Sequence, residues 1–112
     1  MLCEIRGIEN HDYLGNITKI NDIMDIVCLY NNITVTDKII PKHLHPSSRL
    51  SAIYTLEEFH MSIHTFPENN SLAFELCTFQ NNMHFYSIFE FLVQVFHANN
   101  YSSKFNIIER KL

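Results

Sequence analysis

The segment from Met83 to Ala98 constrains the fold most, because its apolar residues recur with the period of an α-helix. They stand at positions i, i+3, i+4, i+7 and i+11, namely Phe85, Ile88, Phe89, Leu92 and Phe96. Such a helix has one aromatic face that must be buried, and this face is wide enough to cover a β-sheet. The sequence therefore predicts a sheet on which this helix packs.

The rest of the chain predicts a second helix and about six strands. Residues 16–30 carry another helical stripe, with Asn16 as its expected cap and Asn31-Asn32 as its stop. β-branched or alternating segments predict strands near residues 2–8, 33–40, 50–56, 59–65, 72–79 and 101–109, with turns at 41–48 and 67–70. This order favours an α+β two-layer sandwich, in which one mostly antiparallel sheet carries both helices on one face. A chain of 112 residues is expected to form a single domain, residues 1–112.

Composition argues against several classes of protein. A net charge of −4 leaves no basic surface for nucleic acid, and no apolar run approaches the length of about 20 residues that a membrane span needs. The chain shows no signal-peptide pattern, so a cytoplasmic protein is expected. Cys3, Cys28 and Cys77 are odd in number and irregularly spaced, which is typical of reduced thiols. We expect Cys3 and Cys28 to be small apolar residues of the core.

The segment from Glu57 to Glu68, with the sequence EEFHMSIHTFPE, holds most of the chemically versatile side chains. It resembles the processing segment of the small bacterial-type S-adenosylmethionine decarboxylases, Glu-Ser-His-Leu-(Ser/Thr)-Ile-His-Thr-Trp-Pro-Glu. The residues in register are Glu58, His60, Ser62, Ile63, His64, Thr65, Pro67 and Glu68. Where that family carries its self-cleaving serine, this chain has Phe59. The predicted element order matches the family over nearly the whole chain, and the specific match covers residues 57–79.

The resemblance implies a reaction and a role for each matching residue. In the family, the serine attacks the preceding carbonyl and becomes a pyruvoyl group, the electron sink for a decarboxylation in spermidine biosynthesis. Glu58 and Phe59 are then the former processing site, and His64 matches the histidine that takes part in processing. Because phenylalanine has no hydroxyl, we expect no cleavage, no pyruvoyl cofactor and no decarboxylase activity.

A second family motif, Phe-Thr-Cys-Gly, corresponds here to Cys77-Thr78-Phe79-Gln80. Phe79 replaces the cysteine that donates a proton, and Cys77 lies two residues before it. Residues two apart share a face of a strand, so Cys77 is a candidate to approach the site. His64 and Cys77 are therefore the candidate catalytic residues. The resemblance further implies a pocket lined by His60, Ser62, Glu68 and Phe79.

No metal site is predicted. His60 and His64 are spaced i, i+4, which would suit zinc on a helix, but the surrounding alternation favours a strand.

Three functions remain open. The favoured one is an uncleaved decarboxylase-like protein that binds S-adenosylmethionine or a related ligand, or that regulates an active decarboxylase subunit. Family members are dimers, so a homodimer or such a heterodimer is expected. The second is an active S-adenosylmethionine decarboxylase with atypical processing, for instance at Ser62. The third is an interaction module without a ligand.

Overall fold

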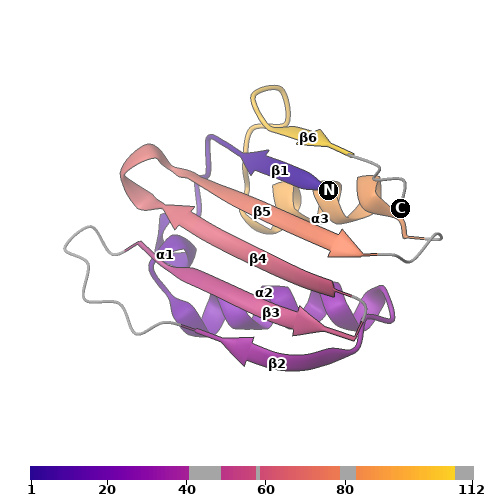
Figure 1. Ribbon diagram of the computed structural model, residues 1–112. Coiled ribbons are helices and arrows are strands. Elements are labelled where there is room, and N and C mark those ends of the chain that lie inside the picture. The colour runs from indigo at the N-terminus through magenta and orange to yellow at the C-terminus, as the bar shows by residue number, and fades with distance from the viewer. Residues whose placement is uncertain (41–48, 58, 79–82, 108–112) are drawn as a thin grey trace.

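The chain folds into one six-stranded sheet with helices on one of its faces (Figure 1). The computed structural model describes residues 1–40, 49–57, 59–78 and 83–107. The elements in chain order are β1 (Leu2–Ile5), α1 (His11–Leu14), α2 (Ile17–Tyr30), β2 (Val35–Ile39), β3 (Ser51–Leu56), β4 (Phe59–Phe66), the 3-10 helix η1 (Pro67–Asn69), β5 (Ser71–Thr78), α3 (Phe85–Val95) and β6 (Lys104–Asn106).

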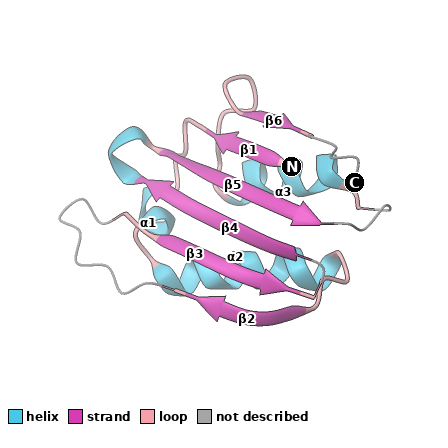
Figure 2. Cartoon of the chain, viewed as in Figure 1, coloured by secondary structure: helices cyan, strands magenta, loops and turns pink. Residues whose placement is uncertain are grey.

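All neighbouring strands are antiparallel, and their order across the sheet is β2-β3-β4-β5-β1-β6. The two long helices, α2 and α3, lie behind the same face of the sheet (Figure 2). The predicted α+β sandwich is thereby confirmed. None of the described helices is long and apolar enough to cross a membrane.

The hydrophobic core lies between this face of the sheet and the two helices. Along β3 to β5, every second side chain is buried against the helices, namely Ala52, Tyr54, Leu56, Met61, Ile63, Leu72, Phe74 and Leu76. The helices contribute their predicted stripes, including Ile20, Met24, Ile88, Phe89 and Leu92. Each large apolar side chain buried in this way stabilises the fold by about 1.5–3 kcal/mol. Cys3 and Cys28 belong to this core, as predicted, and burial raises the pKa of these thiols to about 12 and about 11.

Both ends of α2 follow the predicted capping. The Asn16 side chain accepts a hydrogen bond from the Lys19 amide at 3.2 Å, and the Asn31 side chain donates to the Val27 carbonyl at 2.8 Å. Asn32 then adopts a left-handed conformation with φ of 54°, which asparagine tolerates better than most residues. The Ile33 amide donates to the Cys28 carbonyl at 2.9 Å, so β2 starts at Val35 and not at Ile33 as predicted.

Further differences from the prediction lie near the two ends of the chain. The first strand, predicted near residues 2–8, ends at Ile5. The short helix α1 was not expected. The last strand was expected to begin at Tyr101, but β6 begins at Lys104. The Asn99 side chain accepts hydrogen bonds from the amides of Tyr101 and Ser102 at 2.8 and 3.2 Å, which holds these residues in a turn. The predicted turn at 67–70 is present as η1, and the predicted loop at 41–48 lies outside the described residues.

Tyr54 joins the helix layer to the sheet. Its ring is fully buried, and its hydroxyl donates to the Asn21 side chain and to Asp25 Oδ1, the latter at 3.2 Å. Lys38 on β2 completes the group, because its Nζ lies 2.7 Å from the same Asp25 oxygen and 4.9 Å from the centre of the Tyr54 ring. Burial, and then the neighbouring Asp25 carboxylate, raise the pKa of Tyr54, so the hydroxyl stays protonated and remains a donor.

We predict that Tyr54→Phe lowers the free energy of unfolding by about 1–2 kcal/mol, because the hydrogen bonds from the hydroxyl to Asn21 and Asp25 are lost while the ring is kept. Urea denaturation measures this change. Tyr101→Phe is the matched control, since the Tyr101 side chain is 99% exposed, and it should leave the midpoint unchanged. Equal effects of the two substitutions would contradict the proposed hydrogen bonds.

Candidate functional site on the open face of the sheet

The face of the sheet opposite the helices, here called the open face, carries the second set of alternating side chains. None of the described helices lies on it (Figure 1). Its central part is formed by Ser51, Ile53 and Thr55 of β3, by His60, Ser62, His64 and Phe66 of β4, and by Ser71, Ala73, Glu75 and Cys77 of β5. Most of these side chains are half-buried. Polar groups therefore concentrate in the middle of a sheet whose other face is apolar.

The first polar group on the open face joins β4 to β5. His60 is paired with Cys77 across the strands, and Ser62 is paired with Glu75. His60 Nε2 lies 3.3 Å from Glu75 Oε1, and Cys77 Sγ donates a hydrogen bond to the same oxygen at 3.1 Å. The hydrogen bond from Cys77, followed by the contacts with His60, lowers the pKa of Glu75 despite an opposing effect of burial. Glu75 is consequently charged at neutral pH and is the acceptor at the centre of this group.

The second polar group joins β4 to β3. His64 Nδ1 and the Ser51 hydroxyl are 2.9 Å apart, and their residues are paired across the strands. Ser62 lies between the two groups on the open face and is 8% exposed. The open face thus brings together His60, Ser62, His64 and Cys77, all predicted as site residues.

The predicted processing point lies where β3 passes into β4. Leu56 ends β3, Phe59 begins β4, and the two residues are paired; Phe59 is also paired with Thr78 of β5. A cut before Phe59 would therefore place a new N-terminus in the centre of the sheet, between β3 and β5. Glu58 and Phe79, the other residues predicted here, lie outside the described residues.

Glu68 takes a different position from the other predicted residues. It lies on η1, at the end of β4 opposite His60, and its Oε1 accepts a hydrogen bond from Arg49 Nε at 2.7 Å. The Arg49 guanidinium also lies 5.6 Å from the centre of the Phe66 ring. The ion pair with Arg49 holds η1 close to the start of β3.

Sequence reasoning did not single out Glu75 and Ser51. Glu75 stands two residues before Cys77, and this spacing alone places the two on one face of a strand. Its contact with His60 depends on the register between β4 and β5, which a single sequence does not show. The same holds for Ser51 and His64.

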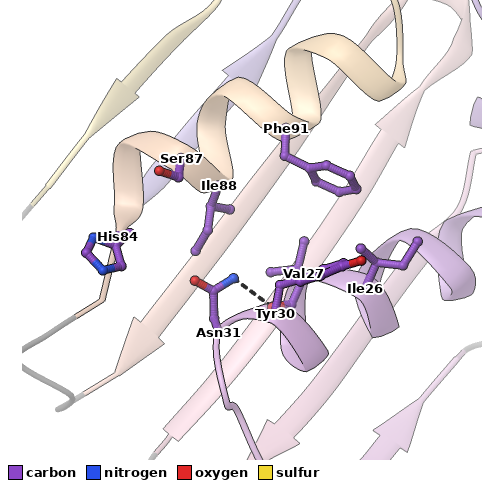
Figure 3. Close-up of a pocket in the computed structure, with 8 residues that line it drawn as sticks. All are labelled: Ile26, Val27, Tyr30, Asn31, His84, Ser87, Ile88 and Phe91. Carbon is purple, nitrogen blue, oxygen red and sulfur yellow. Dashed lines mark hydrogen bonds between the residues drawn. The ribbon is translucent and has the colours of Figure 1, made fainter.

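Among the hollows formed by described residues are two that the polar groups above do not line. One, of about 370 Å³, adjoins the far end of the open face and is lined by Glu4, Arg6, Phe66, Asn69, Ser71, Leu72 and Ala73. The other, of about 270 Å³, lies in the helix layer between the end of α2 and the start of α3 (Figure 3). It is mostly apolar, and the Asn31 amide at its rim is already bonded to the Val27 carbonyl.

Comparison with known proteins agrees with this architecture. Residues 1–110 match the family model of S-adenosylmethionine decarboxylase. The chain belongs to this family. Its structure is similar to the crystal structure of the adenosylmethionine decarboxylase from Aquifex aeolicus VF5, with a TM-score of 0.76 and 17% sequence identity over 99% of this chain and 92% of that chain. A likeness at this level of identity shows a shared fold. No curated protein matches the sequence.

We predict that a thiol reagent labels Cys77 alone in the folded protein. Cys3 and Cys28 are buried and their thiols have raised pKa values, whereas Cys77 is half-buried on the open face. Reaction with Ellman's reagent should release one equivalent per chain under native conditions and three in denaturant. Cys77→Ser should abolish the native reaction, and a fast native reaction in this variant would contradict the placement of the three thiols.

Proposed function

We propose that this protein is an unprocessed member of the S-adenosylmethionine decarboxylase family, without decarboxylase activity, and that it acts by binding. The observation that carries this proposal is Phe59 at the start of β4, where the family's processing serine is found. Pyruvoyl formation needs a hydroxyl on the residue that follows the cut, because that residue must form the ester and then become the ketone. A phenyl ring can do neither.

Ser62 is a poor substitute for the missing serine. Met61 and Ser62 lie within β4, paired with Tyr54 and Ile53 on one side and with Leu76 and Glu75 on the other. An N→O acyl shift at Ser62 would require the Met61–Ser62 peptide to leave both ladders in the centre of the sheet. Each lost backbone hydrogen bond costs about 0.5–1.5 kcal/mol, and more where the freed group stays buried. This geometry favours the unprocessed protein over atypical processing.

The open face supports a binding role for such a protein. His60, Ser62 and His64 keep the family's spacing, and the charged Glu75 carboxylate lies beside them. S-adenosylmethionine carries a sulfonium and an ammonium group, and either cation complements this carboxylate. The same face also offers half-buried Ile53 and Phe66, which suit a second sheet, either of another copy or of an active decarboxylase subunit.

We predict a single species of full-length mass when the purified protein is analysed by denaturing mass spectrometry. Fragments of 58 and 54 residues would show a cut before Phe59, and fragments of 61 and 51 residues would show a cut before Ser62. Either pair would overturn the proposal and identify the processing residue.

The double variant Phe59→Ser, Phe79→Cys is the matched control for this measurement. It restores both functional groups of the family motif and should give partial cleavage before residue 59. Unprocessed wild type together with a cleaved double variant would show that the missing hydroxyl at position 59 accounts for the lack of cleavage.

We also predict that S-adenosylmethionine binds the wild-type protein in isothermal titration calorimetry, and that Glu75→Gln weakens this binding about fivefold to tenfold by removing the charge that faces the ligand's cations. Glu90→Gln, an exposed change on α3, should bind like wild type. Absence of binding, combined with failure to associate with an active decarboxylase, would contradict the proposal in favour of an interaction module without a ligand.

A further inference from the structure

Three side chains of the open face present different metal-ligating atoms to one another. They are a ring nitrogen of His60 on β4 and, on β5, a carboxylate oxygen of Glu75 and Sγ of Cys77. These atoms all lie within 4.8 Å of one another. Imidazole nitrogen, carboxylate oxygen and thiolate sulfur are the three donor types by which proteins bind zinc.

The separations are close to those of a zinc site before the ion arrives. Bonds of about 2.0–2.3 Å at tetrahedral angles place the ligand atoms about 3.6 Å apart. The two distances to Glu75 Oε1, 3.3 Å from His60 and 3.1 Å from Cys77, already fall near this value. The remaining separation, between His60 and Cys77, is at most 4.8 Å and needs to shorten by no more than about 1.2 Å. A change in side-chain torsion achieves this, because the two residues face each other on paired strands.

Strand pairing in the sheet fixes the backbone positions of the three residues. His60 pairs with Cys77, and Glu75 pairs with Ser62, in the unbroken antiparallel register of β4 and β5. Both strands are interior strands, and their opposite faces are buried against the helices through Met61, Ile63, Phe74 and Leu76. The side chains of His60 and Glu75 are each 38% exposed, so an ion from solvent can reach them.

We propose that His60, Glu75 and Cys77 form a binding site for a divalent cation of the zinc class, with three protein ligands and a fourth position open to solvent or to a small ligand. The thiolate and the imidazole favour zinc over magnesium or calcium, which prefer oxygen ligands. On binding, the Cys77 thiol gives its proton to solvent and the sulfur forms the bond to the metal. An open fourth position distinguishes sites that exchange a ligand from closed structural sites. This proposal requires neither S-adenosylmethionine binding nor the absence of processing, and the metal ion and the cations of S-adenosylmethionine would compete for the Glu75 carboxylate.

The test is a titration of the full-length, reduced, metal-free protein with Zn²⁺, and with Co²⁺ as a spectroscopic probe. We expect one ion per chain and, with Co²⁺, a near-ultraviolet thiolate-to-metal charge-transfer band together with the visible bands of tetrahedral cobalt. Cys77→Ser should remove the charge-transfer band. His60→Gln and Glu75→Gln should each weaken Zn²⁺ binding at least about tenfold, since loss of even an outer-shell partner typically costs 10–100-fold.

Two matched variants separate this site from other thiols and histidines. Cys28→Ala removes a core thiol and His84→Gln removes an exposed histidine near the start of α3, and both should bind Co²⁺ like wild type. A band that survives Cys77→Ser, or that is lost in Cys28→Ala, would overturn the assignment. So would the absence of wild-type binding at millimolar metal.

Protection of Cys77 gives a readout that does not depend on the folding of a cysteine variant. Zn²⁺ should slow the reaction of wild-type Cys77 with Ellman's reagent at least about tenfold, and His60→Gln should abolish this protection. Mg²⁺ at the same concentration should have no effect. Equal protection by Mg²⁺, or protection that persists in His60→Gln, would contradict the site.

Discussion

The alternation of side chains along β4 and β5 is the constraint on which the rest of this structure depends. Met61 and Ile63 must face the helices because they fill the core, so their neighbours His60, Ser62 and His64 must face the other way. A slip of one residue would exchange the two sets, burying histidines under the helices and exposing the apolar side chains. Core burial therefore determines which polar groups meet on the open face, and the cross-strand register determines their partners.

Much of the fold could be predicted from the spacing of apolar residues along its helices and strands. The differences between the predicted and the observed elements have local causes. The apolar stripe of α2 and the capping by Asn16 could be predicted, because both depend on residues that are close to one another in the sequence. The turn before β6 could not be predicted in this way. It depends on two hydrogen bonds to the Asn99 side chain, which hold residues whose sequence pattern favours a strand. For the candidate site, the sequence indicates the residues of β4 and Cys77. It does not indicate Glu75, because that contact is created by pairing between strands.

Membership of the S-adenosylmethionine decarboxylase family draws attention to two phenylalanines, Phe59 and Phe79. The chain has the family's fold. The proposed lack of processing rests on Phe59, which the resemblance of residues 57–68 aligns with the family's self-cleaving serine. Cys77, two residues before Phe79, directs its thiol to Glu75 and lies opposite His60. The Cys77 thiol therefore lies beside a carboxylate and an imidazole on the open face, and these are the three groups proposed above to bind a metal ion.

The pairing of Leu56 with Phe59 also bears on how the protein folds. The covalent link between β3 and β4 joins two adjacent interior strands, so a continuous chain closes this hairpin as a local, intramolecular event. In a chain cut at this point, the two strands would meet as separate fragments. Recovery after unfolding would then depend on protein concentration, and dilution would favour the unfolded fragments. In the proposed uncleaved chain, continuity through Phe59 would make the stability of the sheet independent of protein concentration.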